Sequence, residues 1–304
     1  MPTDDAPSAV AGYFAGGQTS SGKTSGIDKI TFADDSKSTL SATLTTARAY
    51  MAAMANSMVA GYVGGGHDGA AISGIDKITF PADTKSTLSA TLTTATYYLA
   101  GMANSGTAGY FAGGQDSGGV VSRINKLTFS DDSISTLAAT LTSARYAPSG
   151  MANSGTAGYF GGGTNSASTR LSGIDKITFS TDTKSTLSAT LTSAKDFLSA
   201  MANSGTAGYF CGGTNNSGHT SGIDKITFAD DSKSTLSATL TSARSELAAM
   251  ANSATAGYIA GGSDGSYLSG IDKITFSADT KSTLSATLTS GRASSAGMAD
   301  SGTL

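Results

Sequence analysis

One sequence unit is repeated six times along this chain, and the repetition restricts its possible folds more than any other feature. A Gly-Tyr pair marks each unit, with its glycine at Gly12, Gly61, Gly109, Gly158, Gly208 and Gly257. Each unit reads approximately TAGYFAGG, a loop, GIDKITFADDS, STLSATLTSAR, a short variable stretch and MANSG. The marking glycines are 48–50 residues apart. Repeats of this length predict one continuous architecture, because each unit buries its apolar face against its neighbours. We therefore expect residues 1–304 to form a single domain.

Each unit contains four short segments with the alternation of β-strands, separated by turn residues. In the segment 27–32, the side chains of Ile27, Lys29 and Thr31 alternate with the other three. Leu40 and Leu44 recur similarly in STLSATLT, which predicts the fourth strand. The sequence Asn-Ser-Gly-Thr predicts a tight turn between two antiparallel strands. Four such strands fit one blade of a β-propeller.

The two ends of the chain supply the parts of one blade. The N-terminus opens with the second strand of a unit, and the residues after Arg292 form an additional copy of the first strand. Pairing of these two segments would close the ring and remove free strand edges. The predicted fold is therefore all-β, a six-bladed propeller closed by its N- and C-terminal strands within one blade.

The units resemble the kelch repeat: an aromatic strand ends in a Gly-Gly pair, and a loop, a strand such as IDKITF and a strand leading to a basic residue follow. The tryptophan usual late in a kelch unit is absent, and leucine stands near its place at Leu40, Leu88, Leu137, Leu187, Leu236 and Leu284. Units such as SGTAGYFAGG are also similar to propellers of phage tail fibres and other virion proteins, particularly of phages that infect cyanobacteria. This resemblance implies a location in the virion, outside the cell when functional, with host-surface glycans or other virion proteins as partners.

Composition argues against several classes of partner. Only 13% of residues are charged and the formal net charge is -3, so no basic field is present for nucleic acid or an anionic membrane. We expect no membrane insertion, since no segment approaches the roughly twenty apolar residues of a membrane span, and no signal peptide, since the first residues lack a basic start and an apolar stretch. Cys211 is the only cysteine, which predicts a small packed residue without an internal disulfide.

Several residues that recur in every unit resemble parts of a sugar-binding or calcium-binding site. Tyr13 and Phe32, with their equivalents, could form a sugar-stacking array, but their recurrence favours packing between blades. Met54 and its equivalents are interpreted as core fillers. Asp34 and Asp35 resemble a calcium loop in composition, yet the glycine and distal glutamate of an EF-hand are missing, which favours a role in the turn. We expect no metal and no cofactor.

Two of the four connections in each unit vary, and antiparallel topology places both on one face. The aromatic and acidic candidates for ligand binding in these connections are Tyr50, Tyr97, Tyr98, Tyr146, Phe197, Glu246 and Tyr267. Such diversity over a uniform scaffold predicts a binding surface, and drift of duplicated loops is the alternative. We expect Tyr50, Tyr97 and Tyr98 to be largely exposed.

A basic residue ends the fourth strand in five units, and Thr96 replaces it in the remaining one. The five candidates are Arg48, Arg145, Lys195, Arg244 and Arg292. They are predicted to ring the mouth of the central channel, where they could hold a carboxylate, sulfate or phosphate group. The alternative is that each one holds loop carbonyls or a neighbouring aspartate.

Enzymatic activity is poorly supported, and we expect the protein not to be an enzyme. His67 and His219 lie in opposite units, so neither a two-histidine metal site nor a histidine-activated nucleophile is readily assembled. A glycan-active hydrolase would have to rely on Glu246, the only glutamate. The sequence favours a recognition module that presents variable loops to a host-surface glycan or anionic ligand. A purely structural virion protein that docks another virion protein is the alternative.

Overall fold

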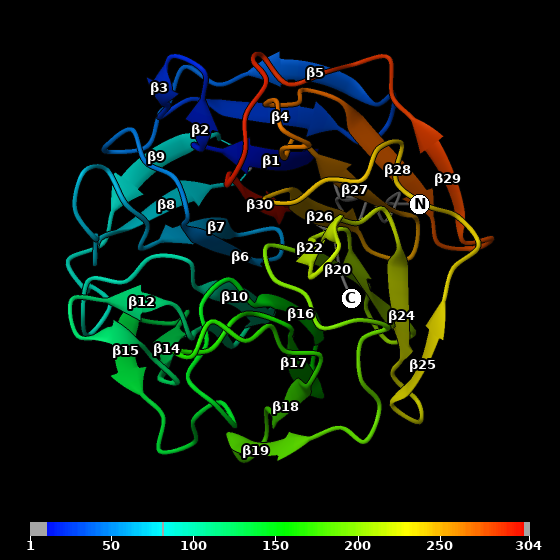
Figure 1. Ribbon diagram of the computed structural model, residues 1–304. Helices are drawn as coiled ribbons and strands as arrows, with labels where there is room; N and C mark the ends of the chain where they lie inside the picture. The colour runs from blue at the N-terminus through cyan, green and yellow to red at the C-terminus, as the bar shows by residue number, and fades with distance from the viewer. Residues whose placement is uncertain (1–10, 81, 301–304) are drawn as a thin grey trace, which may run out of the picture.

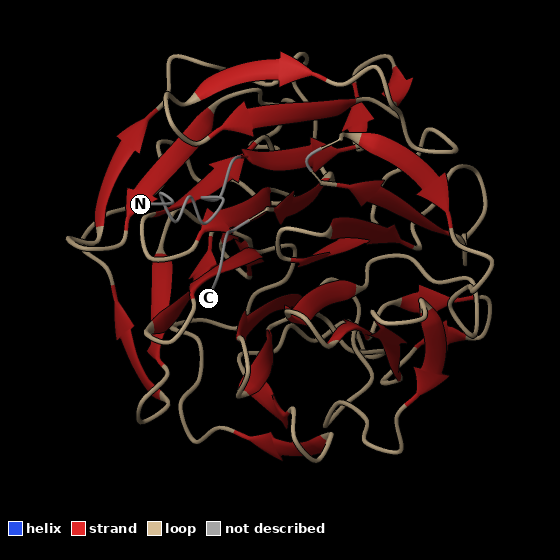
Figure 2. Cartoon of the chain, turned by 180° about the vertical axis from the view of Figure 1, so that it is seen from behind, coloured by secondary structure: helices blue, strands red, loops and turns tan. Residues whose placement is uncertain are grey.

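The structure is a computed structural model that describes residues 11–80 and 82–300, and its regular elements in these ranges are β-strands (Figure 2). Six antiparallel four-stranded sheets surround a central axis as the blades of a propeller (Figure 1). The predicted all-β, six-bladed fold is confirmed. The ends of the predicted domain, residues 1–10 and 301–304, lie outside the described residues. None of the described segments is a helix that could cross a membrane.

The blades are numbered along the chain, and their strands are given from the axis to the rim. Blade 1 contains β30 (Ala296–Ala299), β1 (Ala11–Ala15), β4 (Ile27–Thr31) and β5 (Ser36–Thr39); blade 2 contains β6 (Ala52–Asn56), β7 (Ala60–Gly64), β8 (Ile75–Thr79) and β9 (Thr84–Thr87). Blade 3 contains β10 (Ala100–Asn104), β11 (Ala108–Ala112), β14 (Ile124–Thr128) and β15 (Ser133–Thr136); blade 4 contains β16 (Ser149–Asn153), β17 (Ala157–Gly161), β18 (Ile174–Thr178) and β19 (Thr183–Thr186). Blade 5 contains β20 (Ser199–Asn203), β21 (Ala207–Cys211), β24 (Ile223–Thr227) and β25 (Ser232–Thr235); blade 6 contains β26 (Ala248–Asn252), β27 (Ala256–Ala260), β28 (Ile271–Thr275) and β29 (Thr280–Thr283). Loops of blades 1, 3 and 5 carry two-residue ribbons: β2 (Gln18–Thr19) with β3 (Gly22–Lys23), β12 (Gln115–Asp116) with β13 (Gly119–Val120), and β22 (Thr214–Asn215) with β23 (Gly218–His219).

The ring closes within blade 1, as predicted. Strand β30 pairs antiparallel with β1, and the register places Met298 opposite Tyr13. Blade 1 therefore takes its innermost strand from the C-terminal end of the chain and its other three strands from the N-terminal end.

The fourth strand is shorter than predicted, and Leu44 does not belong to it. Strand β5 ends at Thr39, and the chain then leaves the rim, with the Leu44 amide donating to the Ser25 carbonyl at 2.9 Å. The Thr45 amide and hydroxyl both donate to Asp76 of blade 2, at 2.9 and 2.5 Å. Hydrogen bonds of this kind replace the predicted strand pairing and attach each connection to the next blade, through an aspartate at five junctions and through Asn125 in blade 3.

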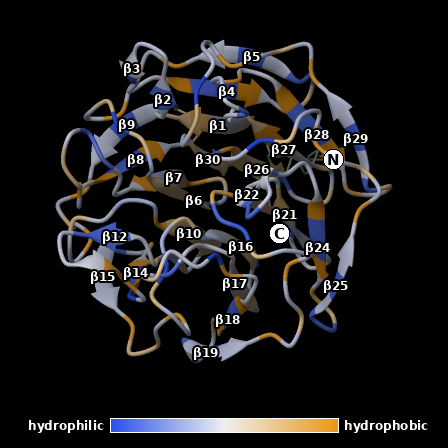
Figure 3. Ribbon diagram, in the orientation of Figure 1, coloured by the Kyte–Doolittle hydropathy of each residue, from blue (hydrophilic) through white to orange (hydrophobic). Residues whose placement is uncertain are grey.

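The same aromatic pair joins every two neighbouring blades. Tyr13 of blade 1 stacks on Phe80 of blade 2, with ring centroids 5.1 Å apart. The stacked pairs at the other junctions are Tyr62–Phe129, Tyr110–Phe179, Tyr159–Phe228, Tyr209–Phe276 and Tyr258–Phe32. These tyrosines and phenylalanines are buried, so their predicted packing role is confirmed. The outer strands β5, β19 and β29 are pale in Figure 3, as expected from their serine and threonine content.

The turn aspartates take part in these junctions as well. Asp34 accepts the Ser36 amide at 3.0 Å, which confirms the predicted role in the turn. Asp35, at φ 58°, accepts the Tyr258 hydroxyl at 2.8 Å and the Lys273 ammonium at 2.7 Å across the junction between blades 6 and 1. The equivalent aspartates in the other blades are Asp83, Asp132, Asp182, Asp231 and Asp279. Each junction therefore combines a stacked aromatic pair with an ion pair.

The repeated methionines and the single cysteine fill space between blades. A Cβ on Gly12 would overlap the Met250 sulfur of the preceding blade, which explains why glycine precedes tyrosine in each unit. Cys211 is fully buried, and burial raises the pKa of its thiol to about 12. The predicted packing roles of the methionines and of Cys211 are confirmed.

Candidate functional site

The variable connections of all blades lie on one face, as the topology predicts. In blade 2, Ala49 in the connection to the innermost strand forms a β-bridge with His67 in the loop between β7 and β8. The corresponding bridges in the other blades are Gln18–Ala293, Tyr97–Gln115, Tyr146–Thr164, Asp196–Thr214 and Ser245–Ser263. We call this side of the ring the variable face.

The five basic residues do not line the channel mouth, and this part of the prediction is wrong. Arg48, Arg145, Lys195, Arg244 and Arg292 are each only 2–3% exposed. Each forms an ion pair with a buried aspartate on the third strand of the blade that its connection leads into: Asp76, Asp175, Asp224, Asp272 and Asp28 in the same order. The structure agrees with the alternative prediction, in which each base pairs with a neighbouring aspartate. These cations are already neutralised and are not directed at an external anion.

The arrangement around Asp76 shows why the cations are held inside. Its carboxylate accepts from Thr45, from Thr87 at 2.8 Å and from the Arg48 guanidinium at 3.1 Å, while the Lys85 ammonium lies at 3.5 Å. Burial alone raises the pKa of Asp76, but the hydrogen bonds from Thr45 and the charge of Arg48 bring that pKa below its ordinary value. A buried carboxylate requires such compensation.

Blade 3 has no buried carboxylate to compensate, because neutral side chains occupy the corresponding positions. Its corresponding positions hold Thr96, Asn125 and Ile134, where other blades have a base, an aspartate and a lysine. The Asn125 amide oxygen accepts from the Thr93 hydroxyl at 2.8 Å, and Ile134 packs against the core. This joint replacement is the signal in the sequence that the basic residues are structural. The break at Thr96 coincides with Asn125 and Ile134 in the next unit along the chain.

A closed ring of backbone hydrogen bonds surrounds the channel on the variable face. Its members, which we call the mouth ring, are Tyr50, Tyr98, Ala147, Phe197, Glu246 and Ser294. Each amide donates to the carbonyl of the preceding member at 2.7–3.1 Å, and each residue has φ between 51° and 63°. This left-handed conformation is unfavourable for residues other than glycine and persists because the surroundings enforce it. The ring fixes six equivalent backbone positions and leaves their side chains free to differ.

Aromatic side chains occupy one side of the mouth ring, contrary to the expectation that they would be largely exposed. The Tyr98 ring centroid lies 4.4 Å from that of Tyr50 and 5.3 Å from that of Phe197. Tyr97 and Tyr146 flank Tyr98 at 4.9 and 5.8 Å. We call these five residues the axial cluster, and all of them are half-buried because rings from four blades converge on one another. Burial, followed by the nearby Tyr50 and Glu246, raises the pKa of Tyr98.

The opposite side of the mouth ring is polar. The Ser294 hydroxyl donates to the Glu246 carboxylate at 2.6 Å, and no ion pair to Glu246 is found within residues 11–80 and 82–300. Tyr50, Tyr98 and Phe197 line, together with Glu246 and Ser294, a cavity of about 80 Å³. The mouth thus combines aromatic faces with one carboxylate.

The remaining candidates lie farther out on the variable face. Tyr267 is 39% exposed and makes no ring contact with the axial cluster in the described part of the chain. The Lys23 ammonium lies 2.9 Å from His67 Nδ1, and the His67 ring contacts Tyr97 at 5.2 Å. No group of three or more His, Cys, Asp and Glu side chains that could hold a metal ion occurs among the described residues.

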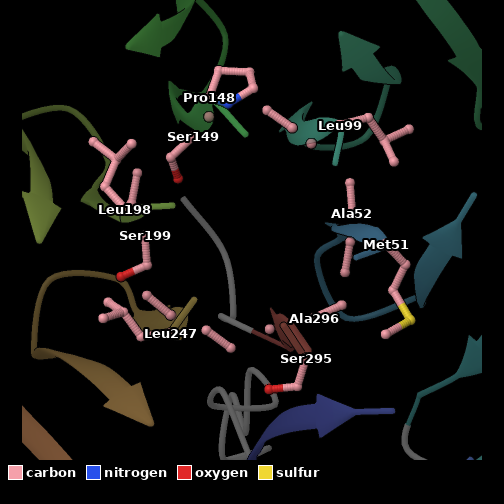
Figure 4. A pocket seen from close by; sticks show the side chains of 18 residues that line it. Met51, Ala52, Leu99, Pro148, Ser149, Leu198, Ser199, Leu247, Ser295 and Ala296 are labelled. Carbon is pink, nitrogen blue, oxygen red and sulfur yellow. The ribbon is translucent and has the colours of Figure 1, made fainter. Parts of the chain in front are cut away.

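Below the mouth ring, the channel contains a cavity of about 150 Å³ (Figure 4). Leucines such as Leu198 and Leu247 surround it near the mouth, and the hydroxyls of Ser199 and Ser295 are buried there without a hydrogen-bond partner. A Cβ on Gly101 would lie 2.5 Å from the Ala53 carbonyl oxygen. Neighbouring innermost strands therefore leave room only for small side chains along this part of the channel.

The face opposite the variable face is uniform. The Ser105 amide donates to the Ser154 hydroxyl at 3.0 Å, and the Ser154 amide donates to the Ser204 hydroxyl at 3.0 Å. The same serine lies at this position in blade after blade, and the main departure on this face is Met58 and Val59 of blade 2, where Val59 is exposed. Most of the chemical diversity therefore lies on the variable face.

No model of a known protein family matches this chain, and no curated protein matches it.

Proposed function

We propose that this protein is a non-catalytic recognition module that binds host-surface glycans through the axial cluster. The observation that carries the proposal is the convergence of Tyr50, Tyr97, Tyr98, Tyr146 and Phe197 on the mouth of the channel. The flat faces of aromatic side chains combine a large apolar area with polar tips, which suits ligands that are apolar on one side and hydroxylated on the other.

Burial of the basic residues directs the proposal towards glycans and away from anions. Among the two ligand classes considered from the sequence, a sulfate or phosphate would need accessible cations. The five repeated bases are instead paired with aspartates inside the blades. A neutral or cationic ligand therefore fits the mouth better than an anionic one.

The wider context of the proposal is a kelch-like propeller in a phage virion or tail fibre. The Gly-Gly pair that follows each second strand, such as Gly16 and Gly17 at φ 60° and 113°, supports the kelch-like reading. Rigid rings with one diversified face suit attachment, because binding loops gain precision from a fixed scaffold. Fold alone does not specify this role, so the virion assignment rests on the resemblance of the units.

A glycan array tests the proposal. We expect the isolated protein to bind a restricted set of glycans, and a Tyr98→Ala, Phe197→Ala double variant to lose that binding. Ala147 already occupies a mouth-ring position, so the backbone there accepts alanine. Tyr267→Ala removes an exposed aromatic outside the cluster and is the matched control, expected to bind normally. Absence of binding to any glycan, with the ring intact by circular dichroism, would favour the alternative of a structural virion protein that docks another protein.

A further inference from the structure

The mouth ring carries a carboxylate that the scaffold does not use. Every third-strand aspartate of blades 1, 2, 4, 5 and 6 is neutralised by a buried base, and every turn aspartate of the blade junctions is paired with a lysine. The Glu246 carboxylate accepts a hydrogen bond from the Ser294 hydroxyl and forms no ion pair within the described ranges. It is also the only glutamate in the sequence. Its charge therefore has no structural counterpart at the mouth.

The geometry of the ring places this carboxylate across from the aromatic side chains. In the closed cycle of six members, Glu246 is three positions from Tyr98 and adjacent to Phe197 and Ser294. The cavity of about 80 Å³ lies among them and is lined by Tyr50, Tyr98, Phe197, Glu246 and Ser294. The negative charge of Glu246 raises the pKa of both Tyr50 and Tyr98, after the larger effect of burial, so its field extends across the mouth.

Aromatic faces and a carboxylate around one cavity are the features that attract an organic cation. The negative face of an aromatic ring attracts an ammonium group within about 6 Å of its centre, and the attraction strengthens when the group is desolvated. Glu246 supplies the opposite charge, and the half-burial of the surrounding rings reduces screening by water.

We propose that the mouth cavity binds an organic ammonium group between Glu246 and the rings of Tyr50, Tyr98 and Phe197. This inference rests on the proposed function insofar as both assign ligand binding to the mouth. It adds that the ligand is cationic, as in an amino sugar or a choline-type headgroup. The two sources share the ammonium group and differ in what surrounds it.

Binding of paired small probes by isothermal titration calorimetry tests the proposal on the full chain. Choline is compared with dimethylbutanol, its uncharged carbon analogue, and glucosamine is compared with N-acetylglucosamine. We expect at least one cation to bind about tenfold more tightly than its uncharged partner, a difference that corresponds to about 1.4 kcal/mol. Preference for choline identifies the headgroup type, and preference for glucosamine identifies the amino-sugar type.

Two variants connect the preference to the cavity. Glu246→Gln keeps the shape of the side chain and is expected to remove the preference for the cation, so that the charged and uncharged probes bind with similar affinity. Glu246→Ser, copied from Ser294 at the equivalent ring position, gives the same result if glutamine disturbs the ring. Asp68→Asn is the control, because it removes one negative charge from a loop of the variable face outside the cavity. We expect it to leave the preference intact.

Equal binding of the charged and uncharged probes would overturn the inference, as would an Asp68→Asn effect as large as that of Glu246→Gln. No binding of either cation at concentrations up to about 50 mM would also overturn it. Failure of the proposed function is recognised separately. If the array shows only neutral glycans and Glu246→Gln does not affect their binding, glycan recognition is supported and the cation site is refuted. If choline binds but no glycan on the array does, the cation site is supported and glycan recognition is refuted.

Discussion

Replacing Arg48 by alanine removes the cation from one buried ion pair and leaves its partner in place. The Arg48 guanidinium lies 3.1 Å from the Asp76 carboxylate and 3.0 Å from the Val63 carbonyl oxygen. Without it, the buried Asp76 keeps its hydroxyl donors and the Lys85 ammonium at 3.5 Å. Breaking one side of a buried ion pair costs about 3–5 kcal/mol. Because Lys85 remains, we expect the lower end, about 3 kcal/mol, and a melting temperature lower by roughly 5 °C.

The triple variant Arg48→Thr, Asp76→Asn, Lys85→Ile is the matched control, since it copies the neutral arrangement of blade 3. There Thr96, Asn125 and Ile134 occupy the same positions in a blade with the same strands. Replacing a buried ion pair with neutral groups of suitable shape is often nearly neutral for stability. We therefore expect the triple variant to unfold within about 1 kcal/mol of the wild-type protein.

Urea denaturation followed by circular dichroism measures the free energy of unfolding of the three proteins. Recovery of stability in the triple variant would show that charge balance around Asp76, rather than the volume of the arginine, sets the effect. A triple variant as unstable as Arg48→Ala would refute this reasoning. So would an Arg48→Ala variant that loses less than about 1 kcal/mol, because the cation would then be dispensable to the blade.

Three further predictions concern the ring. Deletion of residues 293–304 removes β30, keeps Arg292 and exposes the inner edge of β1, so we expect loss of the cooperative thermal transition. An unchanged transition would mean that blade 1 does not need its innermost strand. Tyr159→Ala removes the stacked ring and should lower the free energy of unfolding by about 3–5 kcal/mol. Tyr159→Phe removes only the hydrogen bond to Asp231 and should lower it by about 1.5–3 kcal/mol. Equal losses for the two variants in urea titrations would contradict a packing role for the ring. Folding lowers the pKa values of four buried carboxyls, Asp28, Asp76, Asp224 and Asp272. Their contribution to the stability of the fold is therefore present above the unfolded pKa of about 3.9 and is lost as pH falls through the folded values. Melting curves at decreasing pH should therefore fall steeply below about pH 4, and a flat profile would show that these carboxylates are not held ionised.

The architecture could be predicted from the sequence because its determinants are local and repeated. Strand alternation, the turn sequence Asn-Ser-Gly-Thr and the Gly-Tyr pair recur at the same spacing, and each specifies a conformation within a few residues. The surplus strand at the C-terminus then leaves pairing with β1 as the way to close the ring. Recurrent Tyr and Phe residues were correctly assigned to packing for the same reason.

The candidate site was predicted less well. The sequence placed the bases on the correct connection but did not show the direction of their side chains. Asp76 is 28 residues from Arg48 in the sequence, and only folding of blade 2 brings the two together. The joint change to Thr96, Asn125 and Ile134 was the available signal, and it becomes informative once these positions are recognised as neighbours.

The sequence by itself determined the strand pattern, the number of units and the concentration of chemical diversity in two connections. Tertiary structure decided which variable residues meet. Tyr50, Tyr98, Phe197 and Glu246 are separated by about fifty or more residues, and closure of the ring brings them to one axis through the hydrogen bonds of the mouth ring. That convergence leaves each of these aromatic side chains partly buried, with Glu246 beside the same cavity. The physical reason is that local patterns fix dihedral angles and strand faces, whereas proximity across the axis exists only after all six blades have closed.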